Sequence, residues 1–209
     1  MAENILVVNF KVESEAYQAL SEIRQASVNP AFIVSQACIV KNEGGRIVMK
    51  DHFDTGVETT DDTRHGGLIG GLVGIIGGPL GMLLGSGMGA LIGSAIDSSD
   101  AAKNASLIEK VCEAIPPEST AVIELVSELE PLAADLCFAK YESVLVRLDA
   151  AEVAEEIEEA EKLQKQMEKD ARAKLREEKK EARRQKVEEK RAKMKADFED
   201  FKAKFKKKD

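Results

Sequence analysis

Residues 66–96 form an apolar run of 31 residues that contains no charged side chain and 12 of the chain's 15 glycines. Glycine-rich segments are normally loops, but here leucine, isoleucine and valine occupy the positions between the glycines. The glycines recur at intervals of four residues in two series: Gly66, Gly70, Gly74 and Gly78, then Gly77, Gly81, Gly85, Gly89 and Gly93. On a helix each series forms a ridge without side chains, along which a second helix can approach closely. The spacing therefore predicts helix packing.

The length of this glycine segment is compatible with a membrane, because about 20 apolar residues cross a bilayer. A single crossing would, however, place strands that must share one sheet on opposite sides. Gly77, Gly78 and Pro79 interrupt the segment, since proline lacks an N–H donor and disfavours a straight helix. We therefore expect a partly inserted hairpin with arms at residues 66–77 and 80–96, about 18 and 25 Å long. The alternative is a hairpin packed inside a soluble oligomer. A phosphate-binding loop is excluded, because no Gly-Lys-Ser/Thr follows.

The sequence on either side of the segment predicts an α+β domain. Expected strands lie at residues 5–10, 32–40, 46–53, 120–126 and 143–148, and expected helices at residues 14–25, 100–115 and 132–141. Ser14 is a plausible N-cap of the first helix, and the turn at residues 42–45 predicts a hairpin. The first six elements have the order of a split-βαβ, ferredoxin-like sandwich.

Charge divides the chain further. The net charge is −8, but residues 1–149 carry 10 basic and 21 acidic side chains, whereas residues 150–209 carry 20 and 17. We expect four regions: the first half of the domain at residues 1–60, the glycine segment at 61–98, the second half at 99–149, and a long charged helix at 150–209.

The long helix is predicted by a composition rich in Ala, Glu, Lys and Arg, without glycine or proline. A heptad seam is formed by Val153, Ile157, Ala160, Met167 and Ala171, with Gln164 as a polar exception. A coiled coil and a solvated spacer helix both remain open.

The C-terminal end of this helix has a different character. Phe198, Phe201 and Phe205 share one helical face, and the lysines around them include Lys202, Lys206, Lys207 and Lys208. Aromatic residues with a lysine rim suit an anionic lipid surface. A partner helix or RNA could also bind there. The glycine segment favours the membrane, and no nucleic-acid partner is expected.

Residues that could support catalysis are few. Glu124, Glu128 and Glu130 alternate along a strand and its exit, which indicates a solvent face. His52 and His65 lie near several aspartates, but loop polarity explains them better than a metal site. We expect no catalytic residue, no metal, no cofactor and no small-molecule substrate.

The three cysteines, Cys38, Cys112 and Cys137, form no CxxC pair, so we interpret them as core residues of a protein in a reducing compartment. Residues 1–10 have no basic region before their apolar run and do not resemble a signal peptide.

Together, the strand-helix-hairpin start, the glycines at residues 66–93 followed by Ser94-Ala95-Ile96-Asp97, and the Ile115-Pro116-Pro117-Glu118-Ser119-Thr120-Ala121 sequence resemble a bacterial family. This is the domain of unknown function 1269 family, usually labelled predicted membrane proteins. The resemblance covers about residues 1–150 and leaves the long helix outside. One departure is Pro-Pro-Glu-Ser where the family usually has a Pro-Gly turn. The resemblance implies membrane association and stress-linked roles, and it supplies no catalytic residue.

These observations favour a non-enzymatic structural or scaffolding protein that self-assembles through the glycine segment at the cytoplasmic face of the cell membrane. A pore is an alternative, but a conducting pore normally needs a polar lining, which residues 66–96 lack. A soluble homo-oligomer in the cytoplasm is the other alternative.

Overall fold

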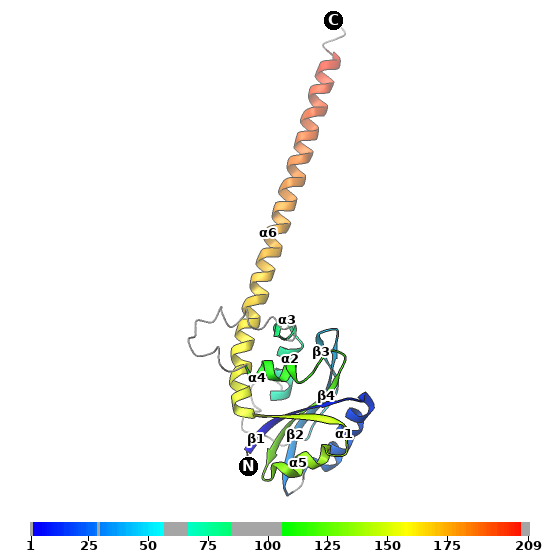
Figure 1. Cartoon of the computed structure of the whole chain (residues 1–209). Helices are drawn as coiled ribbons and strands as arrows, with labels where there is room; N and C mark the ends of the chain where they lie inside the picture. Colours follow the sequence, from blue (N-terminus) through cyan, green and yellow to red (C-terminus); the bar gives the residue numbers. More distant parts are fainter. Residues whose placement is uncertain (1, 29, 57–66, 85–105, 206–209) are drawn as a thin grey trace. The chain divides into compact units, whose positions relative to one another are not determined.

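A computed structural model describes residues 2–28, 30–56, 67–84 and 106–205, with side chains as far as residue 194 apart from residue 192. The chain divides into two compact units, Met1–Gln164 and Lys165–Asp209. The first unit holds the whole sheet and the helices around it, and the second consists of the rest of the long helix (Figure 1).

The elements alternate in the order expected of an α+β domain. In chain order they are β1 Ala2–Phe10, α1 Glu13–Ala26, β2 Phe32–Glu43, β3 Arg46–Asp54, α2 Leu68–Ile76, α3 Pro79–Leu83, α4 Leu107–Glu113, β4 Thr120–Glu128, α5 Pro131–Phe138, β5 Ser143–Asp149 and α6 Ala150–Phe205. The predicted α+β class and the long C-terminal helix are therefore confirmed.

The five strands form one antiparallel sheet in the order β3-β2-β4-β1-β5. β4, which follows the glycine segment in the sequence, lies between β1 and β2, which precede it. β5 pairs with the free side of β1. The two halves of the sequence therefore interleave in one sheet.

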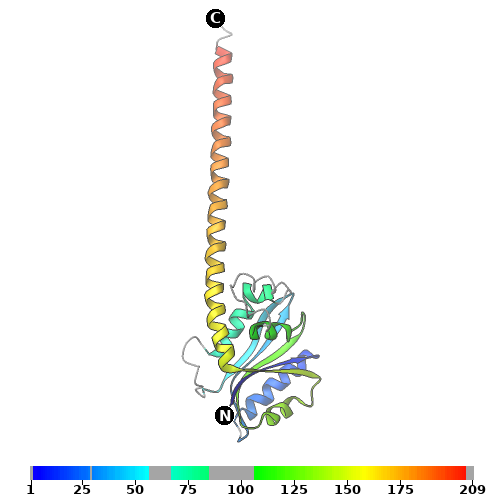
Figure 2. The ribbon, with the colours of Figure 1, turned by 60° about the vertical axis from the view of Figure 1, so that its left-hand side comes forward.

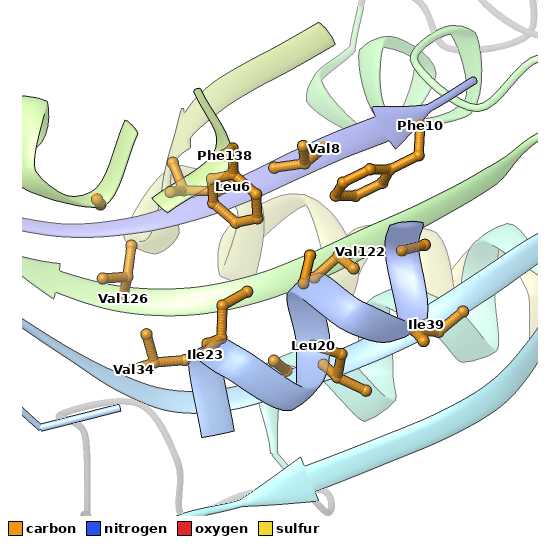
Figure 3. Packing of buried hydrophobic residues seen from close by; sticks show 14 of the residues in the cluster. Leu6, Val8, Phe10, Leu20, Ile23, Val34, Ile39, Val122, Val126 and Phe138 are labelled. Carbon is orange, nitrogen blue, oxygen red and sulfur yellow. The ribbon is translucent and has the colours of Figure 1, made fainter. Parts of the chain in front are cut away.

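One face of the sheet packs against α1 and α5. Side chains at alternate strand positions, such as Leu6, Val8 and Phe10 on β1, point toward Leu20 and Ile23 of α1 (Figure 3). The Phe10 ring meets the Phe138 ring edge-on, with 6.2 Å between centroids, a favourable aromatic geometry. This core is a consequence of the period-2 alternation of a strand.

The opposite face of the sheet is also covered. Ile5 and Val7 alternate with the first set on β1, and both are fully buried. Helices α2, α3 and α4 and the first turns of α6 lie on this side (Figures 1 and 2). Because both faces are covered, β4 is buried along almost its entire length. The domain is thus three layers thick, with helices on both sides of the sheet.

Local signals explain most element ends. Gly44 and Gly45 have φ values of 60° and 86° in the β2–β3 turn, and such positive φ values are characteristic of tight hairpin turns. The Ser14 cap prediction is wrong: α1 begins at Glu13, Val12 is the N-cap residue, and no side chain caps the helix. Of the helix predicted at residues 100–115, the described part begins at Leu107.

The start of α6 is part of the first unit. Val153, Ile157 and Ala160 are buried in its core, so the beginning of the predicted heptad seam packs against the chain's own domain. Cys38 and Cys112 are buried and Cys137 is half-buried, and none of the three forms a disulfide, in agreement with the core role predicted for them.

Candidate functional site: the glycine segment

The glycine segment begins with two helices separated by Gly77 and Gly78. α2 ends at Ile76, where the Gly77 N–H donates to the Val73 carbonyl at 2.9 Å. α3 then starts at Pro79. The N–H at the first position of a helix has no acceptor within the helix, so proline loses no hydrogen bond there. Gly66, Gly85, Gly89 and Gly93 lie outside the described residues.

α2 turns its apolar side chains toward the sheet. Its buried residues are Leu68, Ile69, Leu72, Val73, Ile75 and Ile76. The first arm of the segment is therefore part of the domain core, whereas we expected it to contact lipid or another subunit. Among the described helices, none combines the length and the apolarity that crossing a membrane requires.

Three glycines allow close packing within the chain. A Cβ atom at Gly77 would lie 2.6 Å from the Ile47 carbonyl oxygen, and one at Gly81 would lie 2.0 Å from the Ile76 carbonyl oxygen. A Cβ at Gly78 would lie 2.7 Å from Oε1 of Gln164 on α6. Because backbone atoms cannot move aside easily, any larger residue at Gly77 or Gly81 would displace the segment from β3 or distort its turn.

Gly70 and Gly74 behave differently. Both are exposed on α2, and no described atom lies within 4 Å of a Cβ built at either position. They are one helical turn apart and face away from the sheet. We call this pair the open glycine ridge. The four-residue spacing thus combines glycines that pack closely within the chain with glycines beside which the described structure leaves open space.

The start of α2 is held by Gln36 of β2. The Ile69 N–H donates to Gln36 Oε1 at 3.4 Å, and Gln36 Nε2 donates to Asp54 at 3.0 Å. Gly67 has a φ of 85°, and a Cβ there would lie 2.1 Å from Gln36 Nε2. Gly67 is therefore favoured by its backbone conformation, and a larger residue there would also have to displace the Gln36 amide.

A second cluster of polar residues lies under α5, on the other side of the sheet. Glu124 and Glu128 of β4 are only 1 % and 3 % exposed, so the interpretation of these residues as a solvent face is wrong. Only Glu130, after the strand, is exposed. The alternation was read correctly, but the face on which these residues lie is covered by α1 and α5.

Arg147 of β5 neutralises part of this cluster. Its Nε and one Nη donate to the two carboxylate oxygens of Glu128 at 3.0 and 3.1 Å, and it also contacts Asp135 at 2.5 Å. Asn4 donates to Glu128 at 2.8 Å. Glu128 is thus a buried carboxylate with a bidentate partner.

Glu124 has no comparable partner. Its Oε2 is buried without a hydrogen bond in the described structure, and its strand neighbours are Leu6 and Ala37. Burial, reinforced by the charge of Glu128, raises the pKa of Glu124 to about 8. The side chain is therefore predominantly protonated at neutral pH, a consequence of desolvation.

The predicted lipid-binding end lies in the second unit. Phe198, Phe201, Lys202 and Phe205 belong to helix α6, and their side chains are outside the described set. Lys206, Lys207 and Lys208 lie beyond the described residues.

Residues 63–180 match the family model described as "Protein of unknown function (DUF1269)". The match covers more than half of the 209 residues. The chain belongs to this family. No curated protein and no solved structure matches the chain.

The matched region differs from the expected one. It begins just before the glycine segment, whereas the resemblance was expected from residue 1, and it extends into α6 as far as residue 180. The DUF1269 match therefore contains α2, α3 and β4 together with much of the long helix, which we had placed outside the family.

The departure from the family's Pro-Gly turn has a structural counterpart in this DUF1269 chain. Glu118 has a φ of 62°, a conformation that favours glycine. Its carboxylate accepts a hydrogen bond from the Gly44 N–H at 3.0 Å. The side chain thus provides a contact to the β2–β3 turn that glycine could not make.

Within the described part of this DUF1269 chain, no group of three or more His, Cys, Asp or Glu side chains could hold a metal ion. His52 is exposed on β3, and His65 lies outside the described residues. The two fully buried cysteines have thiol pKa values raised to about 12 by desolvation, so neither is an activated nucleophile. The surface of greatest interest remains the open glycine ridge.

Proposed function

We propose that this protein is a non-enzymatic scaffolding protein, associated with the membrane, whose copies self-assemble through the open glycine ridge of α2. The observation that carries the proposal is that Gly70 and Gly74 are exposed and that a Cβ built at either position would meet no described atom outside its own helix, although the apolar side chains of α2 are buried in the domain. A second copy of the same ridge is the partner that suits it, since small residues let two helix backbones approach closely.

The energetics support this assignment. Glycine inside a helix costs about 1 kcal/mol relative to alanine. At Gly77 and Gly81 close packing explains the glycine, because a Cβ would collide with backbone oxygens. At Gly70 and Gly74 nothing in the described structure offsets the cost. Contact with another copy would offset it.

The architecture proposed for the domain is the ferredoxin-like split-βαβ arrangement. The strand order supports it: β1 and β2 flank β4, while β4 and β5 flank β1. In this proposal β3 is an added edge strand and α2, α3 and α4 form an inserted layer. The insertion would present the ridge on the side of the sheet opposite α1 and α5.

Membrane association is proposed to reside in α6. The apolar side chains of α2 already lie in the core of the domain, so the first arm of the glycine segment is a poor candidate for insertion. The basic, phenylalanine-bearing end of α6 is the better candidate for lipid contact. We place this contact at the cytoplasmic face in the proposal, because the anionic lipids of that leaflet attract basic segments.

A second candidate is a soluble homo-oligomer in which the ridge is buried between copies. The burial of six apolar α2 side chains in the chain's own domain favours it. A pore has no comparable observation in its favour among the described residues.

The glycine ridge is tested by two matched double variants. Gly70→Leu with Gly74→Leu places bulky side chains on the ridge and should convert oligomers to monomers in sedimentation velocity runs at several concentrations. Gly70→Ala with Gly74→Ala keeps the ridge narrow. It should preserve association and raise the melting temperature, because each substitution adds up to about 1 kcal/mol of helix propensity.

The leucine variant should still fold, since a Cβ at either position meets open space in the described structure and leucine has a higher helix propensity than glycine. A folded leucine variant with unchanged particle size would rule out the ridge as the contact.

A further inference from the structure

The second unit carries a regular pattern of basic residues. Successive members alternate between spacings of four and three residues: Lys165, Lys169, Arg172, Arg176, Lys179, Arg183, Lys186, Lys190 and Lys193. All nine side chains are exposed. A spacing of three and four keeps residues on one side of a helix, and at 1.5 Å per residue the pattern extends over about 42 Å. We call it the basic stripe.

Acidic residues avoid the stripe. Between residues 169 and 193 they are Asp170, Glu177, Glu178, Glu181, Glu188 and Glu189. With 3.6 residues per turn, all six fall in the half of the helix circumference opposite the stripe. Just before this region, Glu168 lies beside the stripe and pairs with Arg172 at 3.6 Å. The helix is therefore asymmetric in charge: the stripe side is basic between residues 169 and 193, whereas the opposite half, which also carries Lys174, Arg184 and Arg191, has six acidic and three basic side chains.

The phenylalanines continue the basic side. Phe198, Phe201 and Phe205 lie in the same helix, and at 3.6 residues per turn their positions fall in the same half of the circumference as the stripe. Asp197 takes the next position of the alternating spacing and ends the stripe. The helix thus has one side that is basic for most of its length and aromatic at its end.

We propose that residues 165–205 of α6 lie flat on an anionic lipid bilayer, with the basic stripe against the headgroups and the phenylalanine positions at the boundary of the acyl chains. This inference extends the membrane part of the proposed function and does not depend on self-assembly. A flat anionic surface contacts one side of a helix, so the acidic side faces water. A nucleic-acid groove surrounds a helix more fully and would bring phosphates near the acidic side.

The stripe also opposes pairing of two α6 helices through this side. Like charges at successive seam positions repel one another, and a coiled coil needs apolar residues there. The basic side therefore suits an anionic partner better than a second α6 helix.

Two full-length variants with the same net charge test the proposal. The stripe variant carries Arg176→Gln, Arg183→Gln and Lys190→Gln. The control carries Ala171→Glu, Lys174→Gln and Gln185→Glu, all exposed positions on the other side of the helix. Binding to phosphatidylcholine vesicles with and without phosphatidylglycerol is measured by flotation.

The wild type should bind only the phosphatidylglycerol vesicles, and the stripe variant should bind on the order of 100-fold more weakly, since each basic residue near an anionic surface contributes about fivefold. The control should bind far better than the stripe variant. An equal loss of vesicle binding in both variants would show that only overall charge matters. Binding of both variants at the wild-type level would show that the stripe is not the contact. Either result overturns the proposal, as would stripe-dependent binding to duplex RNA without vesicle binding.

Orientation is tested separately, because the chain contains no tryptophan. A tryptophan introduced as Phe201→Trp should shift to shorter emission wavelength on anionic vesicles, and Gln185→Trp should not. Equal shifts would overturn the flat orientation. If the Gly70→Leu, Gly74→Leu variant does not assemble but still binds vesicles, lipid binding by α6 is independent of self-assembly. The lipid-binding proposal would then hold even if the scaffold proposal fails.

Discussion

At the scale of single residues, Glu124 is the most unusual group in the domain. It occupies the middle of a central strand, its Oε2 has no hydrogen bond in the described structure, and the charges that act on its pKa are those of Glu128 and Arg147. Burying an ionised carboxylate without a partner is costly, so the folded protein holds the proton. The free energy of unfolding of the domain therefore depends on pH in a range where surface carboxylates no longer titrate.

The sign of this dependence follows from the direction of the shift. The pKa of Glu124 rises from 4.5 to about 8 on folding, so between these values the folded chain keeps a proton that the unfolded chain has lost. The stabilising contribution of protonated Glu124 is complete below pH 4.5. As the pH rises from 4.5 to 8, the free energy of unfolding decreases by up to about 1.4 kcal/mol per pH unit.

Glu124→Gln removes this dependence, because an amide cannot ionise. Urea unfolding from pH 5 to 9 should show a smaller decline in the free energy of unfolding for Glu124→Gln than for the wild type, with the variant relatively more stable at pH 9. Glu130→Gln, at an exposed position, is the control and should follow the wild type. Parallel curves for Glu124→Gln and the wild type would contradict this account.

At the scale of elements, the long helix and the short helix α4 stabilise one another through Glu156. Its carboxylate accepts hydrogen bonds from the Leu107 and Ile108 N–H groups at 2.9 and 3.1 Å and from the Ser106 hydroxyl at 2.5 Å. The side chain thus acts as the N-cap of α4 from another helix, satisfying donors that a helix leaves unpaired at its start.

Glu156→Ala should therefore lower the free energy of unfolding by about 1–2 kcal/mol, the typical loss for a removed cap, and should speed amide exchange at residues 107–110. Glu155→Ala, one position away on α6, serves as the matched control. Unchanged exchange at these amides in Glu156→Ala would mean that α4 does not depend on this contact.

The elements themselves were largely predictable. Each strand was placed by its apolar pattern, and the β2–β3 hairpin by the glycines at residues 44 and 45. The misreading of Glu124 and Glu128 shows the limit of a periodic pattern. Alternation shows that the two faces of a strand differ. Whether a helix covers the polar face depends on residues far away in the sequence, here those of α1 and α5.

At the scale of the whole molecule, the sheet constrains topology. β1 and β2 both pair with β4, so the sequences before and after the glycine segment must lie on the same side of any membrane. Ser14→Cys and Glu130→Cys, both exposed, should remain unlabelled by a membrane-impermeant thiol reagent in intact cells and react once the membrane is opened. A Cys137→Ser background removes the half-buried native thiol. Labelling of one position only from outside would be incompatible with the shared sheet.

The sequence alone determined the fold class, the single long helix and the family, because these depend on local periodicity, on composition and on the spacing of the glycines. Only the tertiary structure decided how the glycines are used. Gly77 and Gly81 lie against backbone oxygens and Gly70 and Gly74 face outward, although all four have the same spacing in the sequence. The reason is physical: the spacing fixes only where glycines recur along a helix, whereas what each glycine meets depends on the turn between α2 and α3 and on β3, a strand distant in the chain.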